Sequence, residues 1–434
     1  MAEVSPRETL LRRVEAEIGD IIRIKNKNKV YEGLLMPHHE FSDKDTIVLK
    51  LKNGYNVGVK VSEETKIEVV ERGKKERYKT VQTVPFDPHK PSISILGTGG
   101  TIACYVDYRT GAVHPATSAE DLAFSVPEIF DICNVNARVV FRLLSENITV
   151  KKWQTLAKEI ANEFNQNKVN GVVVPHGTDT MGYTAAALSF MLKGLTGPVV
   201  LVGAQRSSDR PSSDAARNLL DAALVAATSD IGEVVVVMHG EISDSFTTIH
   251  RGTKVRKLHT SRRDAFQTVN EPPLGSVSNS VIKVTQNYRK KSTGKVEVDE
   301  EMEEDVALIY FYPNMQPEEI PDKKGIVLMG TGLGHVSKTL YGRLKELIAN
   351  GTTIVMTSQC IFGRINLNVY STGRDLIKIG VIPGEDMLPE TAYVKLMWVL
   401  AHADSNENIR KLMVTNIAGE ISSRTVIDDF KKYQ

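Results

Sequence analysis

The sequence predicts an α/β protein in three parts. A small β-barrel of SH3-like or related kind (residues 1–85) precedes a doubly wound parallel sheet (92–290) and a smaller α/β domain (306–434). Three observations predict this. Short β-rich runs crowd the first seventy residues, strand and helix patterns alternate after residue 92, and two such strands each end in a segment of glycine and threonine.

Composition is that of an ordinary globular protein. The 434 residues are 41% hydrophobic and 25% charged, with a formal net charge of +1, so overall charge makes no case for nucleic-acid binding. The three cysteines, Cys104, Cys133 and Cys360, show neither metal-ligand nor disulfide spacing. The first twenty residues are charged and contain no apolar stretch long enough for a signal or membrane helix. We therefore expect a cytoplasmic protein without a bound metal or membrane anchor.

The N-terminal part is predicted from its short strands. A helix over residues 5–18 places Leu10, Leu11 and Val14 on one face, and Asn53-Gly54 is a tight hairpin signal. Residues 71–91, rich in charge and proline, are predicted to be a linker. Five strands in about 55 residues indicate a small barrel, and they are expected at residues 19–24, 29–36, 46–51, 55–61 and 66–70.

From residue 92 strands alternate with helices, which is typical of a parallel sheet covered by helices. A basic and then acidic stretch, residues 286–305, interrupts the pattern and is predicted to be a solvated linker. The strands are expected at 93–96, 171–175, 198–203, 233–238, 306–311, 325–329 and 353–357, and the helices near 151–166, 182–193, 336–349 and 387–402.

Two threonine-bearing segments follow predicted strands: Gly97-Thr-Gly-Gly-Thr101 and His176-Gly-Thr178-Asp179-Thr180. The first could be a phosphate loop, but the lysine and Ser/Thr of a Walker sequence are missing. The second could simply cap a helix through Thr178 or Asp179. Because ligands bind at the carboxyl ends of strands in open α/β sheets, the two segments together indicate a hydroxyl nucleophile acting on a small substrate.

With both segments in this order, the chain from residue 92 onward resembles the L-asparaginase and glutaminase family of amidohydrolases. The loop Tyr108–Val113 is similar to the family's flexible loop with its activating tyrosine, and Leu144–Thr149 is similar to its substrate-binding serine segment. Further similar segments are Val200–Arg206, Ser213–Leu219, Ser358–Cys360 and Tyr370–Gly373, the last two being typical of cytoplasmic type I asparaginases.

This resemblance implies the roles of the site residues. Thr101 or Thr178 attacks the amide, Tyr108 assists, Asp179 holds the substrate's α-ammonium, and Ser145, with Glu146 beside it, holds the α-carboxylate. Backbone N–H groups near Gly100 and Thr178 are candidate donors to the oxyanion.

A lysine is the expected base. The resemblance places it just before Pro198-Val199-Val200, a position that is Gly197 here. The resemblance then points to Lys254 as the base. Lys254 lies in a basic and polar segment that we expect to be mobile and to be ordered by a partner or by tRNA. The alternative is that Lys254 is a solvated or tRNA-facing lysine.

The β-rich N-terminal part joined to an asparaginase-like core resembles one branch of the family, the archaeal GatD subunits of glutamyl-tRNA(Gln) amidotransferase. This implies a glutaminase subunit that releases ammonia from glutamine, or asparagine, through a threonine acyl-enzyme, for conversion of Glu-tRNA(Gln) to Gln-tRNA(Gln). A GatE-type partner would bind tRNA, ATP and magnesium. Two copies of this chain would form a homodimeric core within a heterotetramer, and no cofactor is expected in this chain. The alternatives are a free cytoplasmic L-asparaginase with an accessory β-module, and an inactive binding subunit.

Overall fold

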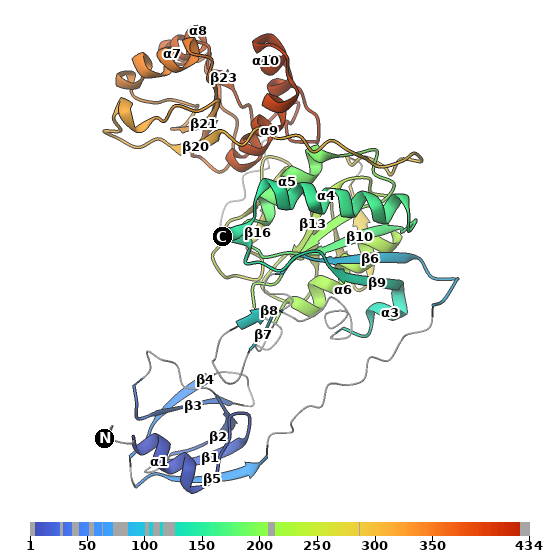
Figure 1. Ribbon diagram of the computed structural model, residues 1–434, viewed down its shortest axis with the longest axis vertical. Coiled ribbons are helices and arrows are strands. Elements are labelled where there is room, and N and C mark those ends of the chain that lie inside the picture. The colour runs from blue at the N-terminus through green and yellow to red at the C-terminus, as the bar shows by residue number, and fades with distance from the viewer. Residues whose placement is uncertain are drawn as a thin grey trace.

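The computed structural model describes residues 5–26, 29–36, 43–51, 56–62, 64–72, 86–99, 104–106, 113–115, 126–206, 213–285 and 287–425. It shows three parts joined in chain order (Figure 1). Within these ranges no helix is both long and apolar enough to span a bilayer. The expected hairpin turn Asn53-Gly54 and most of the predicted linker before residue 86 lie outside the described residues.

The N-terminal module is an antiparallel five-stranded sheet with one helix. Helix α1 (Pro6–Arg13) begins where the Ser5 hydroxyl accepts a hydrogen bond from the Glu8 N–H, with proline at the first helical position. Its Leu10 packs into a core that includes Ile22 and Ile24. All five predicted strands are confirmed, while the SH3-like class stays a prediction. In the order β4-β3-β2-β1-β5 they are Asn56–Lys60, Thr46–Leu51, Lys29–Leu35, Ile21–Asn26 and Lys66–Glu71.

The second part is an eight-stranded sheet in the order β18-β17-β14-β13-β12-β10-β6-β9. The predicted parallel arrangement is confirmed for β9, β6, β10, β12 and β13, while β14, β17 and β18 extend the sheet with antiparallel hairpins that the sequence pattern did not reveal. From β18 to β9 the strands are Val281–Val284, Gly275–Ser278, Thr247–Arg251, Val234–His239, Val199–Val202, Gly171–Pro175, Ser92–Gly97 and Asn134–Val139.

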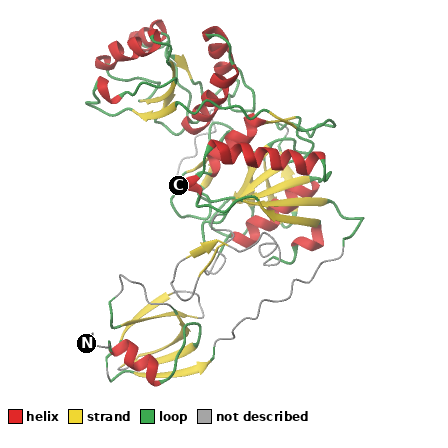
Figure 2. Cartoon of the chain, viewed as in Figure 1, coloured by secondary structure: helices red, strands yellow, loops and turns green. Residues whose placement is uncertain are grey.

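Helices cover both faces of this sheet (Figure 2). Helices α4 (Val150–Asn165) and α5 (Met181–Met191) share one hydrophobic cluster, and α6 (Ala215–Thr228) with α3 (Ile129–Ile132) belongs to the other. Strand β10 is buried along its whole length because both faces are covered, which explains its unbroken valine run. Its carboxyl end therefore emerges at a rigid, central position.

The third part is a parallel sheet in the order β20-β21-β22-β23. Its helix α9 packs against α5 of the second part, so the two α/β parts share one core. The predicted linker is partly structured, since β19 (Glu297–Val298) pairs with β11 (Leu192–Lys193).

The remaining elements of the third part are four strands and four helices: β20 (Val306–Tyr310), β21 (Gly325–Gly330), β22 (Thr353–Ser358), β23 (Ile382–Pro383), α7 (Tyr341–Ala349), α8 (Ser371–Ile379), α9 (Pro389–His402) and α10 (Asn406–Val414). Two short antiparallel pairs lie earlier in the chain: β7 (Cys104–Val106) with β8 (Val113–Pro115), and β15 (Val255–Lys257) with β16 (Phe266–Thr268).

Candidate active site

The two strands that carry the threonine segments end side by side. Strands β6 and β10 are parallel neighbours, and beyond β6 both the N–H and the hydroxyl of Thr98 donate to the Pro175 carbonyl, at 3.2 and 2.8 Å. These bonds join the first glycine-threonine segment to the start of the second. The expectation that both segments reach one edge of the sheet is confirmed for their described residues.

The second segment packs tightly against Ser145. A Cβ built on Gly177 would lie 2.6 Å from the Ser145 Cβ and 2.7 Å from its Oγ, so a side chain at position 177 would displace the serine. The Thr180 hydroxyl donates to the Ser145 carbonyl at 2.7 Å. Ser145 is itself buried, whereas Glu146 beside it is exposed. The structure thus brings Ser145 to the His176–Thr180 segment, as the resemblance implies.

A lysine joins the two central site residues. The Lys257 ammonium donates to the Thr178 hydroxyl at 2.9 Å and to the Asp179 carboxylate at 2.8 Å. Thr178 is buried, while the Asp179 side chain is 70% exposed and so can still meet a ligand. Neither side chain caps the following helix, since α5 begins after Thr180 with no side-chain cap bond. The capping alternative is therefore wrong.

Lys257 is held on a short hairpin. It is the last residue of β15 and lies opposite Phe266 of β16, and the next residue, Leu258, donates its N–H to the Ala265 carbonyl at 2.7 Å. Val255, on the same strand, packs into the core. The base of the hairpin is thus anchored while Lys257 reaches Thr178.

Lys254 occupies a different place from the one expected. Its side chain is fully buried, not mobile, and its ammonium donates to the Asp386 carboxylate at 2.7 Å, across the junction of the two α/β parts. Lys254 lies in the turn before β15, whereas Lys257 is the last residue of β15. Two lysines three positions apart in sequence therefore face different partners, Asp386 of the third part and Thr178.

The expectation for position 197 is also corrected. Gly197 lies two residues before β12, where a Cβ would lie 2.0 Å from the Asn170 carbonyl oxygen. Thr178 follows the opposite end of the neighbouring five-residue strand β10, roughly 17 Å away along the sheet at about 3.3 Å per residue. A lysine side chain at position 197 could not span that distance. Gly197 is a packing glycine, and its identity says nothing about a missing base.

A buried histidine supports the turn from inside. The His176 ring is 1% exposed, with Nδ1 2.7 Å from the Gly177 carbonyl and Nε2 2.9 Å from the Thr184 hydroxyl, which also accepts from the Trp153 indole at 3.0 Å. A carbonyl can only accept, so Nδ1 carries the proton and Thr184 donates to Nε2. Burial lowers the pKa of His176 to about 4, so the ring is neutral near pH 7.

The segment 213–219 supports the site through a third strand. The Asp214 carboxylate accepts the N–H groups of Gln205 and Arg206, and the Asn218 amide donates to the Gly203 carbonyl at 2.9 Å. A Cβ on Gly203 would lie 2.8 Å from the Thr178 methyl group. The loop after β12 is therefore shaped to receive Thr178.

Three expected site residues, Gly100, Thr101 and Tyr108, lie outside the described residues. Sequence reasoning missed Lys257 as a contact of Thr178, as well as the chain from Trp153 through Thr184 to His176. Both lysines lie in the same basic stretch, so the spacing offered no way to choose between them. Among the described residues, no cluster of three or more His, Cys, Asp or Glu side chains could hold a metal ion.

Comparison with protein families agrees with this architecture. Residues 92–290 match the family "Asparaginase, N-terminal", residues 305–413 match "Glutaminase/Asparaginase C-terminal domain", and residues 16–70 match "GatD N-terminal domain". Among solved structures, the L-asparaginase from Thermococcus kodakarensis superposes with a TM-score of 0.69 at 32% identity, covering 77% of this chain and 100% of its own. L-asparaginase I from Vibrio cholerae superposes with a TM-score of 0.67 at 30% sequence identity, covering 77% of this chain and 99% of its own.

Full-length relatives carry all three parts. The GatD subunit of the glutamyl-tRNA(Gln) amidotransferase of Pyrococcus furiosus is 52% identical, covering 98% of this chain and 99% of the relative. That of Pyrococcus abyssi is 51% identical with the same coverage. The solved asparaginases cover only about three quarters of this chain, whereas these relatives span nearly all of it. The chain therefore belongs to the GatD family of glutamyl-tRNA(Gln) amidotransferase subunits, which are built on an asparaginase-type amidohydrolase core.

Proposed function

We propose that the chain hydrolyses glutamine to glutamate and ammonia and supplies the ammonia for amidation of Glu-tRNA(Gln). The observation that carries this proposal is the Lys257 ammonium bridging Thr178 and Asp179. A hydroxyl becomes a good nucleophile when an adjacent base can take its proton, and an amine at hydrogen-bond distance meets that need. Lys257 therefore replaces Lys254 as the proposed base.

The reaction proceeds in two acyl-transfer steps. In its neutral amine form Lys257 takes the Thr178 proton and the threonine oxygen bonds to the amide carbon. The C–N bond then breaks as Lys257 passes that proton to the nitrogen, which leaves as ammonia. Water then attacks the ester, giving glutamate and restoring the threonine. Thr101, with Tyr108, is the alternative first nucleophile, and Thr178 with Lys257 then serves the second step. Backbone N–H groups at Gly100 and Thr178 are the proposed oxyanion donors.

Substrate is held by the groups around this unit. The exposed Asp179 carboxylate accepts one bond from Lys257 and keeps capacity for the α-ammonium of the amino acid. Ser145, packed against Gly177, is placed to receive the α-carboxylate, with Glu146 at the rim. Both glutamine and asparagine carry these two charged groups, so both are proposed substrates.

Amide formation on tRNA requires an activated carboxyl group. We propose that a GatE-type partner binds the tRNA, ATP and magnesium and accepts the ammonia, while this chain contributes no cofactor. The proposed assembly is a homodimer of the asparaginase-type core joined by two partner subunits in the cytoplasm. The names of the full-length relatives, which describe a subunit of an amidotransferase, support a partnered enzyme.

The proposal is tested by comparing Lys257→Ala with Lys158→Ala, an exposed lysine on α4, in the reconstituted two-subunit complex. We expect Lys257→Ala to lower glutamine-dependent amidation at least about a hundredfold, because it removes the base, equivalent to about 2.7 kcal/mol of barrier. Amidation with free ammonium chloride should survive, since that route bypasses the site. Loss of both reactions in a folded variant, or an effect equal to that of Lys158→Ala, would contradict the assignment.

A free L-asparaginase is the second candidate function, favoured by the superposition on two L-asparaginases. It differs in needing neither partner nor tRNA. Asparagine and glutamine hydrolysis by the chain alone, compared with the rates in the complex charged with Glu-tRNA(Gln), separates the two. A high asparaginase rate for the chain alone, with no amidation of tRNA by the complex, would establish the second function.

A further inference from the structure

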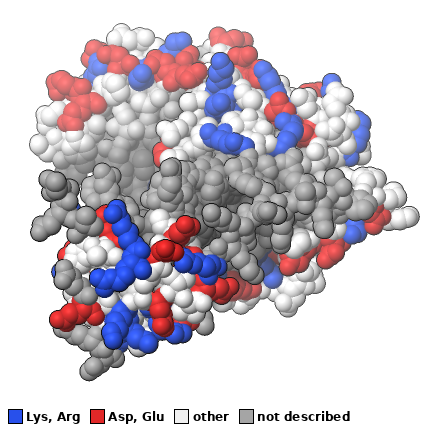
Figure 3. All heavy atoms as spheres, turned by 60° about the horizontal axis from the view of Figure 1, so that its bottom comes forward, with Lys and Arg blue, Asp and Glu red and all other residues white. Residues whose placement is uncertain are grey.

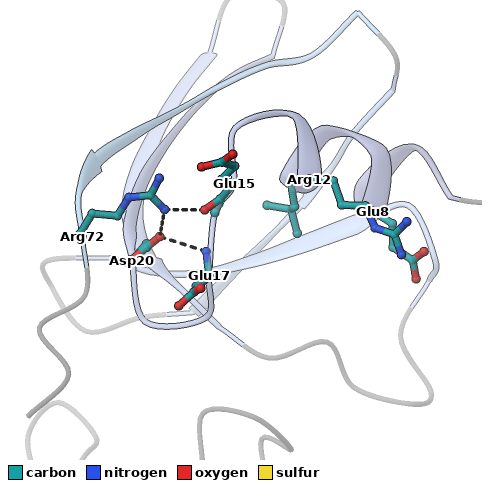
Figure 4. A pocket seen from close by; sticks show the side chains of 8 residues that line it. Glu8, Arg12, Glu15, Glu17, Asp20 and Arg72 are labelled. Carbon is teal, nitrogen blue, oxygen red and sulfur yellow. Dashed lines mark hydrogen bonds and ion pairs between the residues drawn. The ribbon is translucent and has the colours of Figure 1, made fainter.

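Helix α1 of the N-terminal module separates two surfaces of opposite charge. On one side, a cavity of 790 Å³ is lined by Glu8, Glu15, Glu17 and Asp20 together with Arg12 and Arg72 (Figure 4). Within it Arg72 donates to the Asp20 carboxylate and the Glu15 carbonyl, and the Glu17 N–H also donates to Asp20. The carboxylates outnumber the cations, so this side repels a polyanion.

On the other side of α1 lies a groove of 320 Å³ whose charge is positive. Its walls come from α1, β1 and β5, and its apolar lining is Leu10, Val14 and Ile67. Four cations but only one carboxylate, Glu68, line it. On the face that Figure 3 shows, lysine and arginine side chains lie beside aspartate and glutamate side chains, so the excess of cations in this groove is a local feature. The cations are Arg13, Arg23, Lys25 and Lys66.

Two neighbouring positions on β1 differ in how their charge is compensated. Arg23 lies opposite Glu32 on β2 and Glu68 on β5 and forms an ion pair of 2.6 Å with each. Two residues along the same face, Lys25 lies directly opposite Lys66 of β5. Like charges in direct cross-strand register destabilise a sheet.

The lysine pair also lacks counter-ions. In the part of the chain that the structure describes, neither Lys25 nor Lys66 forms an ion pair, and neither does Arg13 at the end of α1, although all three are exposed. A carboxylate at either lysine position would replace the repulsion with an ion pair. Arg23, two residues away, forms such ion pairs with Glu32 and Glu68. An arrangement that costs stability and leaves three cations free around a groove indicates an anionic ligand from outside the chain.

We infer that this groove binds the phosphodiester backbone of RNA. Several phosphates in a row match several uncompensated cations, and the apolar floor between the cations offers contact to the sugars. The choice of RNA as the polyanion rests on the proposed function, which brings a tRNA to the complex. The acidic cavity beyond α1 confines the RNA to one side of the helix. The module is thus an RNA contact of the glutaminase subunit itself, separate from the hydrolytic site.

The inference is tested on the full chain in complex with its partner, by fluorescence anisotropy with a labelled tRNA(Gln) transcript over a series of salt concentrations. For Lys25→Gln/Lys66→Gln we expect about tenfold weaker binding near 0.1 M salt, and a slope of log K against log salt that is smaller by roughly 1.5 to 2, because two phosphate contacts are lost. Lys60→Gln is the matched control, because Lys60 is an exposed lysine at the end of β4 that already pairs with Asp43 and does not line the groove.

A charge reversal sharpens the test. Lys25→Glu would create a cross-strand ion pair with Lys66, so we expect a higher thermal midpoint of the module together with weaker RNA binding than in the glutamine variant. Unchanged RNA affinity and salt slope in these variants would overturn the inference. Weaker association of the two subunits with unchanged RNA affinity would also overturn it, since the groove would then face an acidic protein. Glutamine hydrolysis, measured in the same samples, reports separately on the proposed function.

Discussion

At the scale of single residues, the neutral His176 ring holds the turn that carries Thr178 through hydrogen bonds alone, without a charge of its own. Both ring nitrogens are used, one toward the Gly177 carbonyl and one toward Thr184, and the bond that Nε2 accepts from the Thr184 hydroxyl requires the neutral form. Protonation would place a second donor against the Thr184 hydroxyl and a charge in a fully buried place. The turn that carries Thr178 is therefore sensitive to acid through a residue that contacts no substrate.

This predicts a pH dependence of stability. Burial lowers the pKa of His176 from 6.5 to about 4. Between pH 6.5 and 4 the unfolded chain binds a proton that the folded chain does not, so stability falls as the pH falls through this window, by about 3 kcal/mol in total. In His176→Gln we expect a smaller loss of stability from pH 6.5 to 4, measured by urea unfolding followed through the buried Trp153 in a Trp398→Phe background. The exposed His89→Gln is the control, and an equal pH effect in both variants would contradict this account.

The buried pair of Lys254 and Asp386 predicts a different phenotype from that of Lys257. Lys254→Met leaves the buried Asp386 carboxylate with only the more distant Arg364 guanidinium, at 3.5 Å, which costs about 3 kcal/mol of stability. We expect Lys254→Met/Asp386→Asn to recover much of this loss, because the amide is neutral and can still accept the Ser422 N–H. Chemical denaturation measures both effects. Activity per folded molecule should stay within a few-fold of that of the unsubstituted chain. A hundredfold loss would show that Lys254 takes part in the reaction.

At the scale of elements, the turn between β10 and α5 depends on close approach. Gly177→Ala would push its Cβ into Ser145, whose own carbonyl is held by Thr180. We expect at least a tenfold loss in kcat/KM for glutamine, because a displaced Ser145 or Thr178 weakens substrate positioning. Gly342→Ala in α7 is the control: nothing lies within 4 Å of its Cβ, and alanine favours a helix. Equal activity of the two variants would show that the turn tolerates a side chain.

Elements were more predictable than the contacts between them. The valine runs of β10 and β12 could be assigned because both faces are buried, and the five strands of the module follow from their alternation. The antiparallel strands β14, β17 and β18 were not assigned, because each is short and β14 pairs with β17 across the intervening hairpin of β15 and β16. The same limit applied at the site: Thr178 and Asp179 are adjacent in sequence, but Lys257, 79 residues from Thr178, is brought to them by the hairpin.

At the scale of the whole molecule, the proposed hydrolytic site is built, among the described residues, without contacts from the N-terminal module. In the described ranges, the side-chain hydrogen bonds that join Thr178, Asp179 and Ser145 to their surroundings come from residues beyond 140. We expect a chain beginning at residue 86 to hydrolyse glutamine at a rate within a few-fold of the full chain, while the complex built with it binds tRNA(Gln) more weakly. Steady-state glutaminase assays and anisotropy measure the two. Loss of hydrolysis in the folded shorter chain would show that the module contributes to the site.

The junction of the α/β parts has a consequence for how the protein is made. Lys254 needs Asp386, which lies 132 residues further along the chain. At about 5–20 residues per second, a ribosome takes roughly 7–26 s to cover that interval. During this time the earlier sheet can fold, yet it carries a lysine that is fully buried in the finished protein and still lacks its counter-ion. The nascent chain must therefore keep this region open to water, so its final closure belongs to the last moments of translation or to the time after release.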